Sequence, residues 1–244
     1  MRSREQGTRR AVKQNVILLG KGTLAIRIAD WFLTQPDYDL RLLVPVVPEP
    51  NWTDSLSSWA DSHQVPVVRS GHYKDIPDVS GDTWHTDIAL SVFYDKIIKE
   101  WFIRKCSRIL NLHNSPLPRY RGVSPINWAL KNGERLHGVT IHEITPGIDD
   151  GPICSQLLYS IYPEVDEVQD VYTRALEYGW TLFVQTMPLL QKITPTAQDP
   201  ARATYYTTQQ NAQLGDRRGF TRAESCASVG HPSRHGRLSA NPVA

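Results

Sequence analysis

Cysteine is scarce in this sequence, since its 244 residues include three, Cys106, Cys154 and Cys226. Their spacing matches no metal site, and an odd number without a secretory signal argues against a disulfide framework. No run of eighteen apolar residues occurs, so we expect no membrane-spanning helix. These absences predict a protein of the reducing cytoplasm, with neither a metal site nor a membrane partner.

An excess of charge is also missing, because 27 Lys and Arg residues nearly balance 25 Asp and Glu residues. This balance gives no reason to expect a nucleic-acid partner. Basic residues gather near both ends, and we expect disorder in residues 1–14 and, after a loop-rich appendage at residues 194–225, in residues 226–244. Residues 15–193 remain as one main domain, long enough to bury a core.

The first part of that domain reads as a βαβ unit. A buried strand at Asn15–Leu19 leads into a glycine turn and an amphipathic helix, and the run LRLLVPVV follows as a second strand. Such a unit crosses over right-handedly into a parallel sheet. We therefore predict an α/β fold with a mostly parallel sheet and a short C-terminal appendage.

The glycine turn fits the pattern G-x-G-x-x-A at Gly20, Gly22 and Ala25, which leaves three interpretations. It could hold a dinucleotide pyrophosphate, but no acidic residue ends the second strand as that fingerprint requires. It could instead let the helix pack closely on the strand. In the third interpretation Lys21 and the loop N–H groups meet phosphates on a substrate.

Further elements follow in alternation. Trp52 lies in a loop, where it could stack on a base but more simply covers the core. The run DIALSVFY predicts a buried strand, DKIIKEWFIRKC a helix, and ICSQLLYS another strand. A long helix is predicted from about residue 168 to residue 189 by apolar residues at helical spacing.

The stretch from Asn111 to Pro152 gathers polar groups between two strand-like runs. Asn111 and His113 are two residues apart at the end of an apolar run, so they share one face at a strand's end. The strand GVTIHEI then leads into the turn TPGIDDG, which carries Asp149 and Asp150. Ligands of open α/β sheets bind at such strand ends, so we interpret this stretch as an active site.

Three kinds of chemistry are possible for these groups. A metal site would use His113, His142 and Asp149, but Asn-x-His has no usual ligand spacing. A nucleophilic triad would need Ser115, which lacks the strained G-x-S-x-G turn. The remaining chemistry is direct acyl transfer, in which Asn111 donates to a developing oxyanion, His113 moves protons and Asp149 orients the imidazole.

The motifs NLHNSPLPRYRG and HGVTIHEITPGIDDGPI strongly resemble the formyltransferases that use N10-formyltetrahydrofolate, which have a Rossmann-like catalytic domain. The resemblance implies that residues 15–193 form a formyltransferase catalytic domain. It places the catalytic residues at Asn111, His113 and Asp149, and leaves Asp150 at a variable position.

The resemblance also implies that the formyl donor N10-formyltetrahydrofolate is the co-substrate. In this family the folate pocket is formed by backbone after one strand and by the loop before the catalytic Asp. These positions carry over here to Phe93, Tyr94, Asp95, Lys96, Ile97, Pro146, Gly147 and Ile148.

The acceptor differs among the members of this family. The segments SVFYDKII, GVSPINWALKNG and GDRRGFTRAES look most like sugar N-formyltransferases, which formylate the 4-amino group of TDP- or GDP-linked 4-amino-4,6-dideoxysugars for surface glycans. Lys21, Trp52 and Tyr120 are the candidate sugar contacts, and Arg121 is equally consistent with a structural role.

Other possibilities stay open at this point. The acceptor could be methionyl-tRNA, although the chain lacks the length and the basic charge of such enzymes, or a purine-pathway ribonucleotide. The fold could also be a binding module for folate or nucleotide sugar without turnover. Members of the family often dimerise, so a homodimer is a further expectation, although the low-complexity C-terminus departs from the family pattern.

Overall fold

The computed structural model describes residues 13–217, which are built around a six-stranded sheet. Its strands lie in the order β2-β1-β3-β4-β6-β7. Their bounds are β1 Gln14–Gly20, β2 Tyr38–Pro45, β3 Thr86–Val92, β4 Cys106–His113, β6 Leu136–Glu143 and β7 Ile153–Ser160. The first four strands are parallel, and β6 is antiparallel to both β4 and β7. The predicted α/β fold with a mostly parallel sheet is confirmed.

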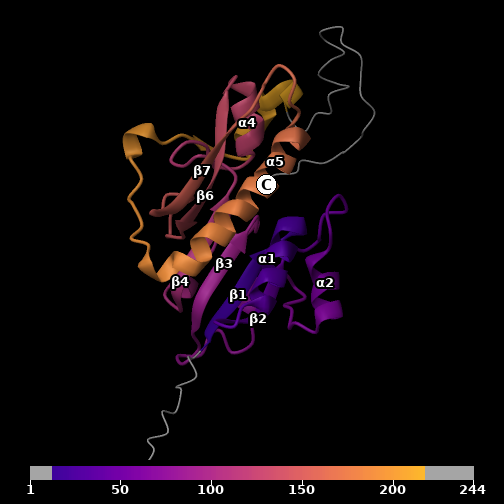
Figure 1. Ribbon diagram of the computed structural model, residues 1–244, viewed down its shortest axis with the longest axis vertical. Coiled ribbons are helices and arrows are strands. Elements are labelled where there is room, and N and C mark those ends of the chain that lie inside the picture. Colours follow the sequence, from indigo (N-terminus) through magenta and orange to yellow (C-terminus); the bar gives the residue numbers. More distant parts are fainter. Residues whose placement is uncertain (1–12, 218–244) are drawn as a thin grey trace, which may run out of the picture.

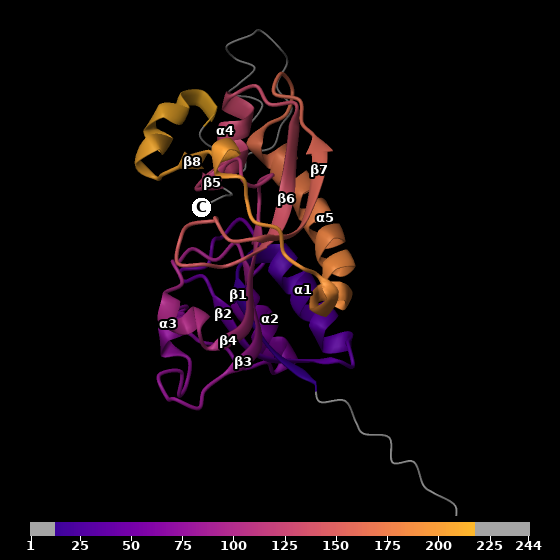
Figure 2. The same ribbon diagram turned by 90° about the vertical axis from the view of Figure 1, so that its left-hand side faces the viewer.

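Helices cover both faces of this sheet, as Figures 1 and 2 show. Their bounds are α1 Gly22–Thr34, α2 Leu56–His63, α3 Glu100–Ile103, α4 Pro125–Lys131 and α5 Val168–Thr186. The larger core cluster joins one sheet face to α1, α2, α4 and α5. The smaller cluster joins the other face to α3 and to the short helical turn η1, Tyr73–Asp75. The side with α3 also carries the polar groups of the central stretch.

The turn between β1 and α1 is shaped by close packing. A Cβ on Gly20 would lie 2.0 Å from the carbonyl oxygen of Val92, and one on Gly22 would lie 2.7 Å from the Thr53 hydroxyl. Real Cβ atoms do not approach backbone so closely, so glycine is required where β1 meets β3. These contacts, with β3 and with the loop before α2, account for both glycines of the pattern, while close packing of the helix on the strand stays a prediction.

The predicted helix over residues 95–106 is mostly wrong. The α-helix occupies Glu100–Ile103, and residues 95–99 form an open connection after β3. The buried hydroxyl of Tyr73 holds this connection, because it donates to the Ile97 carbonyl at 3.2 Å and accepts from the Lys99 N–H at 3.0 Å. Tertiary contacts therefore override the local preference for helix.

Strand β4 alternates its side chains between the two faces. Leu110 and Leu112 belong to the core beneath α1 and α5, whereas Ile109 belongs to the core beneath α3. Asn111 and His113 follow Ile109 at intervals of two, so both face the α3 side, as the sequence predicts. On β6, His142 pairs with Asn111, which brings a second imidazole to the same face.

The segment after α5 returns to the main domain. Thr196 pairs with Ile153, and strand β8, Tyr205–Tyr206, runs parallel to β5, Arg121–Gly122. The described 3-10 helices η2 Met187–Lys192, η3 Pro200–Arg202 and η4 Gln209–Arg217 lie in this part. The predicted disorder at residues 226–244, and at nearly all of residues 1–14, lies outside the described residues.

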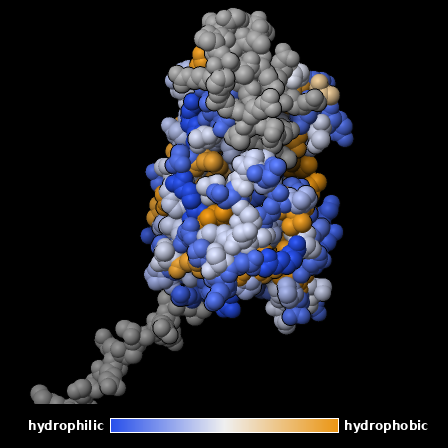
Figure 3. Space-filling model, turned by 90° about the vertical axis from the view of Figure 1, so that its right-hand side faces the viewer, coloured by the Kyte–Doolittle hydropathy of each residue, from blue (hydrophilic) through white to orange (hydrophobic). Residues whose placement is uncertain are grey.

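The surface of the domain is mixed in character. Apolar residues are scattered among polar ones over the coloured part of the face in Figure 3. Across residues 13–217, no helix combines the length and apolar character needed to cross a membrane.

Candidate active site

A cavity of about 480 Å³ lies on the α3 side of the sheet, where β3 and β4 end. This is the place where ligands of open parallel sheets bind, and the volume suits a small-molecule site. Two walls flank it, one formed by the connection after β3 and the loop before Asp149, the other by β5 and the segment that begins at β8. Asn111, His113, His142 and Asp149 also line it.

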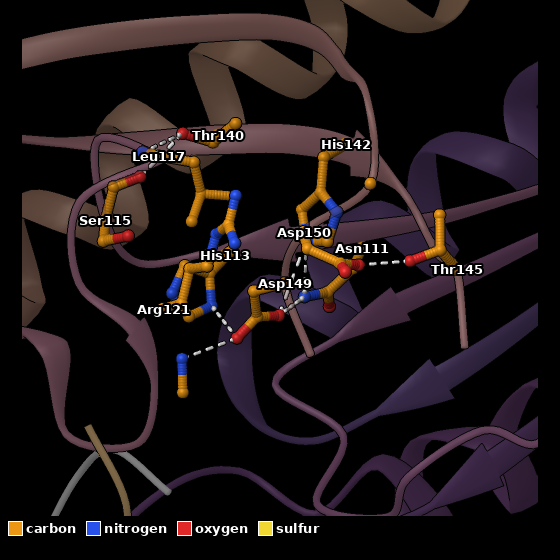
Figure 4. Close-up of polar contacts among 12 residues, drawn as sticks. Asn111, His113, Ser115, Leu117, Arg121, Thr140, His142, Thr145, Asp149 and Asp150 are labelled. Carbon is orange, nitrogen blue, oxygen red and sulfur yellow. Dashed lines mark hydrogen bonds and ion pairs between the residues drawn. The ribbon is translucent and has the colours of Figure 1, made fainter. Parts of the chain in front are cut away.

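Asp149 is the centre of the polar cluster shown in Figure 4. Its Oδ1 accepts from the Asn111 amide at 3.3 Å and lies 3.6 Å from Nε2 of His142. Its Oδ2 accepts the Gly122 N–H at 2.8 Å and lies 3.7 Å from Nδ1 of His113. The three residues that the sequence assigns to catalysis are therefore brought together.

His113 is held in one tautomer by its backbone partner. Its Nε2 lies 2.9 Å from the carbonyl oxygen of Tyr120, which can only accept, so Nε2 carries the proton and donates it. In the neutral ring Nδ1 is then bare, and it faces Asp149 Oδ2 within the cavity. A proton taken up at Nδ1 would be stabilised at once by that carboxylate.

His142 fixes Asn111 by the same logic. Its Nδ1 donates to the Glu143 carbonyl at 2.8 Å, so Nε2 is an acceptor and receives an amide hydrogen of Asn111 at 3.2 Å. The amide has two hydrogens, and the second points to Asp149. The hydrogen bond to His142 therefore fixes the direction of the second N–H of the amide. This N–H can donate a hydrogen bond to a ligand oxygen in the cavity.

The Asp149 carboxylate is nearly buried, with 14% of its side chain exposed. Burial raises its pKa, but the positive charges that His113 and His142 carry when protonated, together with the Gly122 N–H, lower the pKa more strongly. The resulting pKa lies well below the ordinary range of an aspartate. Asp149 is therefore ionised at neutral pH and provides a fixed negative charge beside two imidazoles.

A glutamine from the C-terminal segment anchors the turn that carries Asp149. Gln198 donates from Nε2 to the carbonyls of Asp149 and Gly151, both at 2.8 Å. Its Oε1 accepts two bonds from Arg121, at 2.7 and 3.0 Å. Arg121 thus supports the loop through Gln198. The carboxylate of Asp150 instead accepts from the Thr145 hydroxyl within the turn.

Most of the predicted folate positions line the cavity. They are Phe93, Tyr94, Asp95, Lys96, Ile97, Gly147 and Ile148, while Pro146 is absent from the lining. Ile97 and Ile148 are exposed apolar side chains, at 58% and 39%. Exposed apolar residues on a cavity wall are suited to cover the flat face of a ligand ring.

The three predicted sugar contacts lie elsewhere. Lys21 is buried at the start of α1, with 6% exposed, and burial lowers its pKa despite the nearby Asp95. Trp52 packs edge-on against Tyr172 at 5.7 Å beside the core, as the simpler interpretation predicts. None of these three, Lys21, Trp52 and Tyr120, lines the cavity.

The placement of Tyr120 has a clear physical reason. Its side chain is 2% exposed, and its hydroxyl donates to Glu134 at 2.6 Å and accepts from Asn132 at 3.1 Å. The ring is also stacked on Tyr206. Tyr120 therefore supports the site through its backbone carbonyl, which accepts from His113, and its side chain does not reach the cavity.

The second wall of the cavity is not predicted by any pattern in the sequence. Tyr205, Thr207, Thr208 and Gln209 line the cavity, as does Asn114. No local pattern places the residues after β8 near His113, because about ninety positions separate them. For His142 the sequence indicates only the role of a possible metal ligand, whereas the structure places it on the same face as Asn111 and His113. Within residues 13–217, no group of three His, Cys, Asp or Glu side chains could hold a metal ion.

Residues 68–187 match the family model described as formyl transferase. The chain is 35% identical over 149 residues to the methionyl-tRNA formyltransferase of Fervidobacterium nodosum, a match that covers 60% of this chain and 46% of that protein. The chain thus spans about half the length of the curated relatives it matches.

Two solved structures show the same fold at 25% identity. The N-formyltransferase of Helicobacter canadensis, in complex with folinic acid and dTDP-3-aminofucose, has a TM-score of 0.69 and aligns over 81% of this chain and 72% of its own. A formyltransferase of Anoxybacillus kamchatkensis, in complex with UDP-4,6-dideoxy-4-formamido-L-AltNAc and tetrahydrofolate, has a TM-score of 0.57, with coverages of 82% and 88%.

Proposed function

Since the chain carries a formyl transferase domain, we propose that it moves a formyl group from N10-formyltetrahydrofolate to the amino group of a nucleotide-linked sugar. The observation that carries this proposal is the convergence of Asn111, His113 and Asp149 on one cavity. A neutral imidazole with a bare nitrogen, a fixed carboxylate and an oriented amide are the parts that acyl transfer between two nitrogens needs.

The reaction begins when the acceptor amine attacks the formyl carbon and forms a new C–N bond. The formyl oxygen becomes an oxyanion, which accepts a hydrogen bond from the Asn111 N–H that otherwise donates to Asp149. The attacking nitrogen loses its proton to Nδ1 of His113, and the imidazolium is stabilised by Asp149. The bond from the formyl carbon to N10 then breaks, and His113 returns the proton to N10. Formamide and tetrahydrofolate are the products.

The donor side of the cavity suits the folate. Ile97 and Ile148 offer exposed apolar surface, and Gly147 leaves backbone accessible next to Asp149. We assign Phe93, Tyr94, Asp95, Lys96 and these three residues to folate binding. Pro146 is left out of this assignment because it does not line the cavity.

The acceptor is proposed to be an amino sugar linked to a nucleoside diphosphate. Two solved structures that match over four fifths of the chain contain nucleotide-linked sugars, one with an amino group at position 3 and the other with a formamido group at position 4. We predict that the formyl group is accepted by the 4-amino group of a TDP- or GDP-linked 4-amino-4,6-dideoxysugar. Methionyl-tRNA is the second candidate, favoured by the curated relatives named methionyl-tRNA formyltransferase, of which the chain covers under half.

The test is incubation of the protein with 10-formyltetrahydrofolate and a panel of acceptors, with products identified by mass spectrometry. The panel contains dTDP-3-aminofucose, dTDP- and GDP-linked 4-amino-4,6-dideoxysugars, and methionyl-tRNA. We expect a gain of one formyl group on a nucleotide sugar. Formylation of the tRNA alone would establish the second candidate, and no product from any acceptor would refute formyl transfer by this chain.

A further inference from the structure

Asn114 is a buried amide that has no partner for its side chain. The residue is 2% exposed, and neither Nδ2 nor Oδ1 makes a hydrogen bond. An unpaired polar group in the interior is energetically costly, so proteins rarely keep one without a use. Asn114 directly follows His113 and lines the same cavity. The missing partner is therefore expected to be a group on the bound substrate.

The position of Asn114 is fixed by its backbone. Its carbonyl oxygen accepts from Nε2 of His137 at 2.9 Å. Burial lowers the pKa of His137 to about 3, so this imidazole stays neutral and keeps its single donor on that bond. The backbone of Asn114 is thus held beside the reacting centre by a rigid partner, while its side-chain amide contributes no bond to the fold.

The second wall of the cavity carries polar groups of the same uncharged kind as the Asn114 amide. Tyr205 is 47% exposed, and its ring lies over Gly122, where a Cβ would meet it at 2.8 Å. Its neighbour Tyr206 is stacked on Trp128 with the ring centroids 4.3 Å apart, which anchors the strand. Thr207, Thr208 and Gln209 continue the wall. Among the described residues, this side carries hydroxyl and amide groups and one aromatic face, but no charged side chain.

These groups indicate the kind of ligand that fits. A sugar hydroxyl both donates and accepts, as the Asn114 amide does, and the apolar face of a pyranose or a base can lie on the Tyr205 ring. In the part of the chain that the structure describes, this wall offers no Lys or Arg to a phosphate, so it suits the sugar ring or the base of the acceptor and not its phosphates. The charged side chains Asp95 and Lys96 line the opposite, donor side.

Resting on the proposed function, we propose that Asn114 and Tyr205 form the acceptor subsite and select a hydroxylated ring next to the reacting amine. Asn114 pairs with a ring hydroxyl, and Tyr205 covers the ring or the base attached to it. Asn114 is a substrate-binding residue on this account, with no role in holding the fold.

The test compares the wild type with Asn114→Leu, Tyr205→Ala and Tyr205→Phe. Each protein is assayed for formyl transfer to the nucleotide sugars of the panel, with separate KM values for the acceptor and for 10-formyltetrahydrofolate, and for its midpoint of urea unfolding. Asn114→Leu should lower kcat/KM for the acceptor at least tenfold and leave the donor KM within about twofold. Its unfolding midpoint should equal or exceed that of the wild type, because two unpaired polar atoms are removed.

Tyr205→Ala should raise the acceptor KM about fivefold or more, while Tyr205→Phe keeps the ring and stays near the wild type. The subsite is refuted if the wild type is active and Asn114→Leu has the same acceptor KM. It is also refuted if the urea midpoint of Asn114→Leu falls below that of the wild type, as expected for an asparagine that stabilises the fold. Transfer to methionyl-tRNA alone also refutes it. If the wild type transfers formyl to nothing, the proposed function has failed and the subsite falls with it.

Discussion

Replacement of Gly122 by alanine tests how β5 and β8 build the site. Gly122 has φ +86°, and a Cβ there would lie 2.1 Å from the carbonyl oxygen of Tyr206. The left-handed backbone alone costs about 1–2 kcal/mol for alanine. The clash forces the two strands apart and removes the bonds from Arg121 N–H to Thr204 O and from Val123 N–H to Tyr206 O. Two such bonds contribute about 1–3 kcal/mol together.

The expected loss in free energy of unfolding is therefore about 2–5 kcal/mol for Gly122→Ala. Activity should fall as well, because the Gly122 N–H holds Asp149 Oδ2 at 2.8 Å. A shift of about 1 Å in a catalytic group can cost up to about a hundredfold in rate, so we expect kcat to drop at least tenfold. Urea unfolding and formyl transfer under saturating substrates measure the two effects.

Gly133→Ala is the matched control. Gly133 has a similar φ of +70°, but no atom lies within 4 Å of the position that a Cβ would take. It should lose only the backbone cost of about 1–2 kcal/mol and keep full kcat. Equal losses of stability in both variants, or full activity in Gly122→Ala, would refute the role given to the β5–β8 contact.

Three further predictions concern the polar cluster. Asp149→Asn should lower kcat on the order of a hundredfold. Because folding lowers the pKa of Asp149, the ionised carboxylate stabilises the fold at pH values above its unfolded pKa of about 4, and this stabilisation is lost as the pH falls below that value. The urea midpoint of Asp149→Asn should therefore decline less steeply below about pH 4 than that of the wild type. Gln198→Leu should cost about 1–3 kcal/mol in unfolding and reduce kcat, since it frees the turn at Asp149. His142→Leu should lower kcat about tenfold at unchanged KM, and His142→Gln, which can still accept from Asn111, should recover much of it. The role of Asp149 is contradicted if the urea midpoint of the wild type does not decline below about pH 4. The roles of Gln198 and His142 are contradicted if Gln198→Leu keeps the stability and kcat of the wild type, or if His142→Gln has a kcat as low as His142→Leu.

Periodic patterns made the centre of the fold predictable. The buried run at Asn15–Leu19 and the helix after it became β1 and α1. The two-residue spacing of Asn111 and His113 placed both on one face of β4, and the turn after β6 delivered Asp149 to them. These predictions succeeded because side-chain direction in a strand follows from position alone.

Contacts between distant segments were beyond the reach of those patterns. Residues 95–99 are held open by Tyr73, which no local preference encodes. Tyr120 was predicted to meet the sugar, but its φ of +62° and its bond to Glu134 direct the side chain into the interior. Tyr205 reaches the cavity through the short pairing of β8 with β5. A two-residue ladder gives no periodic signal in the sequence.

The central claim is tested most directly by one measurement of transfer itself. The protein is mixed with a stoichiometric amount of 10-formyltetrahydrofolate that carries ¹³C in the formyl group, together with an amino sugar linked to dTDP, and the ¹³C resonance is followed. We predict that the formyl signal of the folate is replaced by that of a sugar formamide, with one tetrahydrofolate released per formamide formed. Release of free formate in place of formamide, or no loss of the folate signal, would contradict the account.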